Sequence, residues 1–271
     1  MARNHWLNLK TTVHQILEVM PVLTRRPGEF ADRLLGILDN RWLEPRHQPP
    51  AYDVHEIRAV YAALSEHFDQ SADDILGEVA LSDIETTVKA AIEALPTDAP
   101  FPQKHHADFA LARFAYLICR LVQPEVVVET GVAYGVTSAF ILKAMEVNGR
   151  GTLFSIDLPA SVRADASQYV GHLIPADLRP RWKLTIGASR RVLRPLLQEV
   201  GTPDIFLHDS LHTYRNMRYE FASIKRPRVI LSDDIEGNAA FQDLIGGSSP
   251  VYAAVAREQN KSGYFGICIY P

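Results

Sequence analysis

Two short polar segments of this 271-residue chain carry the side chains best suited to chemistry: His208-Asp209-Ser210-Leu211-His212 and Ser232-Asp233-Asp234. Each follows an apolar run that is typical of a buried strand. Because the carboxyl ends of adjacent parallel strands lie about 5 Å apart, we expect Asp209, Asp233 and Asp234 to converge. Carboxylates this close repel unless one is protonated or a cation lies between them. Oxygen ligands favour magnesium, calcium or manganese over zinc. The alternative is a metal-free site in which one acid is protonated or caps a helix.

His212 is the second candidate for chemistry in the first segment, three residues after Asp209. An imidazole has an ordinary pKa near 6.5, which suits it to proton transfer at neutral pH. Proton transfer is therefore one role that this residue type offers. A helix-capping or substrate-orienting role is the alternative.

A third segment has the pattern of a ligand-binding turn. Three valines, Val126 to Val128, predict a strand buried on both faces. Glu129 follows them, then Gly131-x-x-x-Gly135, then a predicted helix. A strand, a tight glycine turn and a helix bind nucleotide-like ligands at the carboxyl end of parallel sheets. The next predicted strand ends at Asp157, whose carboxylate suits the two hydroxyls of a ribose.

Strands and helices alternate from this point to the end of the chain. The further predicted strands are 153–156, 182–186, 204–208, 228–231, 251–257 and 264–270, and one of the intervening helices is expected within 164–173. The last two strands are separated by too few residues for a crossover helix, so they form an antiparallel hairpin. The predicted fold class is α/β, a doubly wound sheet of seven strands with one reversed edge strand.

The first hundred residues have apolar residues at helical spacing and no chemistry that the sequence identifies. Prolines at positions 96, 100 and 102 mark the predicted domain boundary. We therefore expect a helical N-terminal cap, lid or dimerisation region over residues 1–100, and a ligand-binding domain over residues 101–271.

These features resemble the class I S-adenosylmethionine-dependent methyltransferases, over about residues 101–271. The glycine spacing after Glu129 differs from the G-x-G-x-x-G of dinucleotide dehydrogenases, and the terminal hairpin sets this family apart from the nicotinamide folds. The resemblance implies a seven-stranded Rossmann-like methyltransferase sheet and S-adenosylmethionine as methyl donor. It implies donor binding by Glu129, Gly131, Tyr134, Gly135, Ser138, Asp157, Gly187, Ser189 and Asp209.

The acidic cluster is similar to that of the magnesium-dependent O-methyltransferases acting on catechols and on sugars of natural products. That similarity implies Asp209, Asp233 and Asp234 as ligands of Mg²⁺, with Asp209 and His212 as catalytic residues. It implies a hydroxyl of a small molecule as acceptor and a role in natural-product tailoring. Sugar-modifying relatives read Asp-Gly-Asp-His here, with the second acid as base. This chain has Leu211 in that place, so the base role moves to His212 or disappears.

Two other functions stay open. One is a metal-independent methyltransferase acting on nitrogen or a carboxylate, and the other is a donor-binding module without turnover, which Leu211 favours.

A net charge of -4 gives no general attraction to nucleic acid or to anionic membranes. No apolar run approaches the roughly 20 residues that span a bilayer. We therefore expect a cytoplasmic protein whose partners are a small-molecule acceptor and, through the N-terminal helices, further copies of itself.

Overall fold

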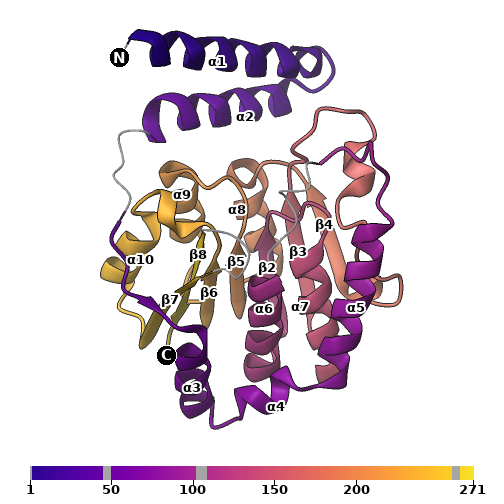
Figure 1. The fold of residues 1–271 in the computed structure, drawn as a ribbon, viewed down its shortest axis with the longest axis vertical. Helices are drawn as coiled ribbons and strands as arrows, with labels where there is room; N and C mark the ends of the chain where they lie inside the picture. Colours follow the sequence, from indigo (N-terminus) through magenta and orange to yellow (C-terminus); the bar gives the residue numbers. More distant parts are fainter. Residues whose placement is uncertain (1, 45–49, 102–108, 258–262) are drawn as a thin grey trace.

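A mixed sheet runs through the molecule (Figure 1). The computed structural model describes residues 2–44, 50–101, 109–257 and 263–271, and within them the sheet has eight strands. They are β1 (Val54–His55), β2 (Val126–Thr130), β3 (Thr152–Asp157), β4 (Trp182–Ile186), β5 (Ile205–His208), β6 (Val229–Ser232), β7 (Tyr252–Arg257) and β8 (Tyr264–Ile269). Their spatial order is β1-β7-β8-β6-β5-β2-β3-β4. The α/β fold with a terminal hairpin is confirmed.

The strand order reverses at β2, which pairs in parallel with both β3 and β5. Doubly wound sheets bind ligands at the carboxyl end of such a point. The reversed strand is β8, and the expectation that it lies at an edge is wrong: β8 is antiparallel to β6 on one side and to β7 on the other. An eighth strand that the sequence pattern did not predict, β1, pairs in parallel with the outer side of β7.

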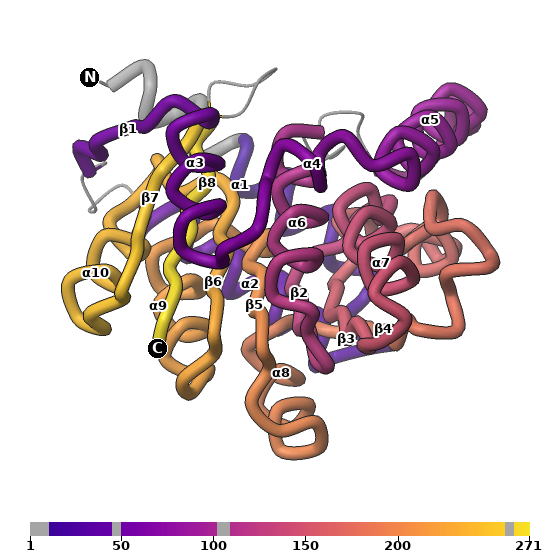
Figure 2. Tube along the Cα trace, turned by 90° about the horizontal axis from the view of Figure 1, so that it is seen from below, coloured from indigo at the N-terminus to yellow at the C-terminus, as the bar shows by residue number. Residues whose placement is uncertain are grey.

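Helices cover both faces of the sheet (Figure 2). One face carries α3 (Ile57–Phe68), α4 (Ala72–Leu76), α5 (Val79–Glu93), α6 (Phe109–Val122) and α7 (Val136–Asn148); the other carries α8 (Ser189–Val200), α9 (Tyr214–Ser223) and α10 (Ala240–Ser248). Each face has its own hydrophobic cluster against the sheet. Helix α6 is buried along nearly its whole length, so it is a core element. The start predicted for this helix, at residue 106, lies outside the described residues.

The helix expected within 164–173 is reduced to a 3₁₀ turn at Ala166–Tyr169, η4. Two further 3₁₀ turns are η5 (Arg179–Arg181) and η6 (Ile235–Gly237). Gly171 has a φ of 68°, which ends helical structure, and a Cβ there would lie 2.2 Å from the ring of Trp182. The amide of Gly171 donates to the carbonyl of Ala133 (3.0 Å). This segment is therefore shaped to hold the glycine turn after β2.

The N-terminal residues form a pair of helices above the carboxyl end of the sheet (Figure 1). They are α1 (Ala2–Leu23) and α2 (Pro27–Leu38), and α2 continues as a π-helical turn, η1 (Asp39–Leu43). We call α1, α2 and η1 the N-terminal hairpin. By contrast, α3 to α5 pack against the main body. The domain boundary near residue 100 stays a prediction.

The outer face of α1 is partly apolar, with Val13, Leu17 and Met20 between 43% and 61% exposed at helical spacing. Self-association through these helices also stays a prediction. Within the described residues, every helix is too short or too polar to cross a lipid bilayer.

Candidate active site

A cavity of about 640 Å³ lies between the carboxyl ends of β2, β3, β5 and β6 and the N-terminal hairpin. This is the expected place for a ligand in a doubly wound sheet. Its walls include these residues predicted from the sequence: Glu129, Gly131, Asp157, Gly187, Ser189, Asp209, His212, Asp233 and Asp234. The structure thus brings six of the nine predicted donor-binding residues and the acidic cluster into one cavity.

The glycine turn lies directly against the loop that follows β5. Gly131 has a φ of 85°, and a Cβ there would lie 1.8 Å from the carbonyl oxygen of Asp209. Only glycine permits both the left-handed backbone and this approach. The amide of Asp209 donates to the carbonyl of Thr130 at 2.8 Å. The geometry therefore holds the catalytic candidate Asp209 beside the predicted donor site.

Asp157 holds the glycine turn from the neighbouring strand. Its Oδ2 accepts hydrogen bonds from the amides of Val132 and Ala133, both at 2.7 Å. The residue is 7% exposed, and burial raises the pKa of its carboxyl to about 6, although the two amide hydrogen bonds oppose this. Asp157 therefore has a structural task in addition to the ribose contact predicted for it.

Glu129 is buried at the end of β2, with 1% exposure. Its Oε2 accepts from the hydroxyls of Ser138 and Ser155, each at 2.7 Å, and Ser155 in turn accepts from Trp182 Nε1 at 2.9 Å. Burial raises the pKa of Glu129 to about 8, with the two serine hydrogen bonds opposing the rise. Ser138, predicted to bind the donor, is placed to hold Glu129 instead of lining the cavity.

Tyr134 and Gly135, two further residues predicted to contact the donor, lie behind the cavity wall. The hydroxyl of Tyr134 donates to the carbonyl of Phe101 (2.9 Å) and accepts from its amide (3.0 Å). Phe101 itself lines the cavity. Gly135 has a φ of 89° at the start of α7, and a Cβ there would lie 2.8 Å from the Cα of Gly171. Both residues thus shape the wall from behind.

His212 lies between two of the predicted metal ligands. Its Nδ1 is 2.9 Å from Oδ2 of Asp234, and its Nε2 is 3.6 Å from Oδ1 of Asp209. Burial opposes a charge on the imidazole, but the hydrogen bonds and negative charges of the two carboxylates outweigh this effect. They raise the pKa of His212 well above 6.5. An imidazolium here would compensate the repulsion between the two acids.

The predicted magnesium site is not assembled in this arrangement. Asp209, Asp233 and Asp234 all line the cavity. Among the residues that the structure describes, however, no group of three or more His, Cys, Asp or Glu side chains is arranged to hold a metal ion. The imidazole of His212 takes the place between Asp209 and Asp234 that a cation would need. The residues as placed do not fit a metal.

A buried polar cluster on α9 holds the loop after β5, which carries Asp209. Glu220 of α9, fully buried, accepts from Thr130 Oγ1 (2.6 Å), Ser210 Oγ (2.7 Å) and Asn216 Nδ2 (3.0 Å), and its Oε2 lies 2.7 Å from His208 Nδ1. Burial opposes ionisation of Glu220, but the charge and hydrogen bond of His208 and the hydroxyl groups of Ser189 and Thr130 lower its pKa to about 2. The ends of β2 and β5 are thereby tied to α9 on both sides of Asp209.

Comparison with known proteins agrees with this geometry. A family model described as a methyltransferase domain matches residues 128–231, which contain the glycine turn, Asp157, Asp209 and His212. The match covers less than half of the chain and identifies a methyltransferase domain around the cavity. The matched segment runs from β2 to β6 and so includes the strands that form the cavity. A search of curated proteins found no match.

Solved structures resemble this methyltransferase domain in fold. An O-methyltransferase from Bacillus cereus, determined with SAH, has a TM-score of 0.50 at 14% identity and covers 78% of this chain and 97% of its own. The O-methyltransferase TomG from Streptomyces achromogenes, involved in tomaymycin synthesis and determined with SAM, has a TM-score of 0.48 at 16% identity, covering 72% and 91%. At these identities the likeness concerns the fold alone.

The sequence predicts a helical cap or lid over residues 1–100, but not the side chains that α2 contributes to the roof of the cavity. Asp32, Arg33 and Gly36 of α2 line the cavity, and an NH2 of Arg33 donates to the carbonyl of Pro159 (2.9 Å) just after β3. A Cβ at Gly36 would lie 3.4 Å from the side chain of Leu211. A glycine inside a helix costs about 1 kcal/mol relative to alanine. A Cβ at that distance makes an ordinary van der Waals contact, so Gly36 gives no clear sign of the cavity.

Glu129 gives the free energy of unfolding a defined dependence on pH. Because the pKa of Glu129 is about 8 in the folded state against 4.5 ordinarily, the folded protein holds a proton that the unfolded chain releases. This contribution is complete below pH 4.5 and is lost as pH rises to about 8. The slope is about 1.4 kcal/mol per pH unit. Denaturant unfolding of the free protein at pH 6, 7 and 8 should show it.

The Glu129→Gln variant is the control for this prediction. It cannot ionise, so its free energy of unfolding should fall less steeply with pH than that of wild type. The comparison is needed because the raised pKa of His212 acts in the same direction above pH 6.5. Parallel slopes for the two proteins would contradict the assignment to Glu129.

Proposed function

We propose that this protein transfers the methyl group of S-adenosylmethionine to a hydroxyl group of a small molecule. The observation that carries the proposal is the position of His212, held between Asp209 and Asp234 on the wall of the cavity, next to the glycine turn. We extend it to natural-product tailoring, because the N-terminal hairpin roofs the cavity and would suit an enclosed small acceptor.

The donor would occupy the part of the cavity formed by the glycine turn, Asp157 and the segment Gly187 to Ser189. Oδ2 of Asp157 is engaged by backbone amides, so the proposal assigns the ribose hydroxyls to the other carboxylate oxygen. Glu129 would face the ammonium of the methionyl group. A positive charge near a carboxyl favours its ionised form. Donor binding should therefore lower the pKa of Glu129.

The residues of the cavity would then accept the proton that the acceptor hydroxyl loses during methyl transfer. In the transfer, a new bond forms between the acceptor oxygen and the methyl carbon, the carbon–sulfur bond breaks, and S-adenosylhomocysteine leaves with the electron pair. The hydroxyl proton goes to Nε2 of His212, the ring nitrogen that does not face Asp234. The negative charges of Asp209 and Asp234 stabilise the imidazolium that results.

Magnesium-assisted methylation is the second candidate. The observation in its favour is that Asp209, Asp233 and Asp234 line one cavity. It requires His212 to leave its position between two of these acids, since the residues as placed do not form a metal site.

The test is methyl transfer from labelled donor to a panel of catechols and vicinal diols, with EDTA or with added magnesium. We expect a methylated oxygen product in both conditions. Loss of turnover in EDTA that magnesium restores would favour the second candidate, and magnesium should then bind wild type but not Asp233→Ala in calorimetry. Methylation of amines or carboxylates alone would refute the proposed acceptor. Binding of S-adenosylhomocysteine without turnover of any acceptor would indicate a donor-binding module.

A further inference from the structure

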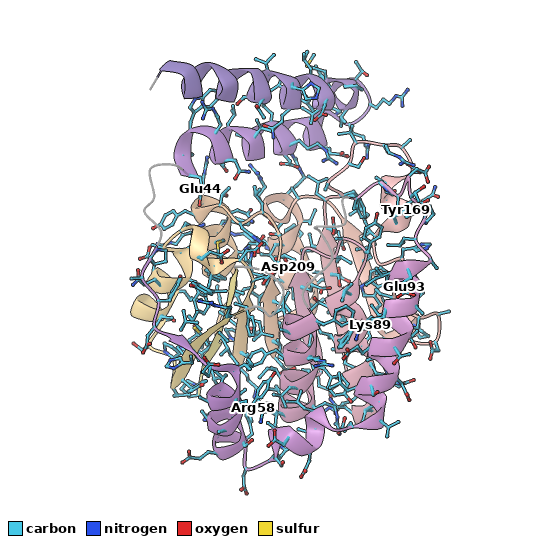
Figure 3. The ribbon with its side chains drawn as sticks, in the orientation of Figure 1. Glu44, Arg58, Lys89, Glu93, Tyr169 and Asp209 are labelled. Atoms are coloured by element: carbon cyan, nitrogen blue, oxygen red, sulfur yellow. The ribbon has the colours of Figure 1, made fainter. Side chains whose placement is uncertain are left out.

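Glu44, directly after η1, connects the N-terminal hairpin to the far side of the site. Its Oε2 accepts from the backbone amide of Tyr214 at 2.8 Å, and its Oε1 accepts from Nδ2 of Asn238 at 2.7 Å. Figure 3 shows Glu44 below α2 and beside α9, with Asp209 nearer the middle of the site. One carboxylate from the N-terminal region thus meets two donors from the catalytic half of the chain.

Asn238 passes this contact on to His212. The side chain of Asn238 is fully buried, and its Nδ2 also donates to the backbone carbonyl of His212 at 3.1 Å. Its Oδ1 accepts from the amide of Ala240 at 3.0 Å, which fixes the orientation of the side-chain amide. The two hydrogens of Nδ2 therefore have two acceptors, the carboxylate of Glu44 and the carbonyl of His212.

Glu44 also completes the first turn of α9. The first amides of a helix have no partner within the helix and carry a partial positive charge. Thr213, the N-cap, accepts from the amide of Asn216 (3.3 Å), and Glu44 accepts from that of Tyr214. The backbone of His212 is thereby held at its carbonyl by Asn238 and, two residues later, by Glu44.

Two ion pairs of the N-terminal hairpin differ in kind from the contacts of Glu44. Asp32 pairs with Arg191 of α8 at 2.9 Å, and Asp39 with Arg215 of α9 at 3.3 Å. The two arginine side chains are 54% and 65% exposed, and ion pairs that reach into solvent contribute little to stability. These pairs attach the hairpin to the body. The contacts of Glu44 reach the loop that carries the proton acceptor.

We propose that Glu44 is a positioning residue for methyl transfer. It fixes the backbone that follows His212, through Asn238 at the His212 carbonyl and directly at the Tyr214 amide, so the N-terminal hairpin completes the proton-accepting site. This inference rests on the proposed function, in which His212 receives the proton of the acceptor.

The test compares Glu44→Gln and Glu44→Asp with wild type and with Glu66→Gln, which removes an exposed charge from α3. A glutamine offers one acceptor oxygen and turns its NH2 toward a donor, while an aspartate keeps the charge but loses reach. In both Glu44 variants, hydrogen–deuterium exchange at the Tyr214 amide should become at least about tenfold faster, or about 1.4 kcal/mol less protected. With catechol as acceptor, kcat should fall about tenfold while the KM for S-adenosylmethionine stays within about twofold. The Glu66→Gln control should match wild type.

Two results would overturn the inference. Unchanged exchange at Tyr214 would show that Glu44 does not hold this loop. Faster exchange with unchanged kcat would show that the contact is only structural. Failure of the proposed function gives a different result: wild type would bind no S-adenosylhomocysteine in calorimetry, or would methylate no hydroxyl acceptor. In that case Tyr214 exchange still decides whether Glu44 fixes the loop.

Discussion

The His212→Ala variant is expected to bind S-adenosylhomocysteine with wild-type affinity and to lose about 10²–10⁴-fold in kcat, the range typical for removal of a general base. The physical reason is the position of the imidazole, 2.9 Å from Asp234 and 3.6 Å from Asp209, where the methyl side chain of an alanine could not accept a proton. The measurement is donor consumption under single-turnover conditions, with binding measured separately by calorimetry.

The dependence of this rate on pH follows from the raised pKa of His212. A base must be deprotonated to act, so activity should rise with pH and level off well above 6.5. Replacing Asp234 by Asn removes one negative charge beside the ring, and the rise should then shift to lower pH. The matched control for His212→Ala is His172→Ala. This variant removes an exposed histidine and should keep full activity. Wild-type kcat in His212→Ala would contradict the proposed role.

Replacement of Asp157 is expected to have the largest effect on donor binding. Loss of its hydrogen bonds to the ribose should cost about 3 kcal/mol, or about 100-fold in Kd for S-adenosylhomocysteine, measured by calorimetry. The structure adds a second effect for Asp157→Ala, since the amides of Val132 and Ala133 would lose their acceptor. That variant should therefore also unfold at a lower temperature.

The Asp157→Asn variant separates these two effects. Its amide oxygen can still accept from Val132 and Ala133, while its NH2 group replaces the oxygen assigned to the ribose. We expect a melting temperature near that of wild type together with a clearly weakened affinity. Wild-type affinity in Asp157→Asn would remove this residue from the donor site.

The parts of the fold that the sequence predicted are those with a strong local pattern. The strand expected at 182–186 is β4 without change, and the buried runs before Asp209 and Asp233 are β5 and β6. Because parallel strands place their carboxyl ends together, the convergence of the acids also followed from the pattern. The prediction of a helix within 164–173 was wrong. Gly171 must lie close to the ring of Trp182, and this contact between distant positions has no local signal.

The contacts inside the site could not be predicted, because the local sequence has no signal for them. The bond between Glu44 and Tyr214 joins positions separated by 170 residues, and no pattern around Glu44 marks it. In the same way, the resemblance implied a base at His212 but not its place between two carboxylates. The metal prediction relied on those carboxylates being free to meet a cation.

The position of β8 has a consequence for the order in which the chain folds. Because β8 joins β6 to β7, and β7 is the partner of β1, strand β1 near residue 54 has no place in the sheet until residues 264–269 are present. The left part of the sheet in Figure 1 therefore depends on pairings between the two ends of the sequence. Such long-range pairings form slowly. During synthesis, the strands from β2 to β6 can assemble first, and β1 can join the sheet only after residues 264–269 have been made.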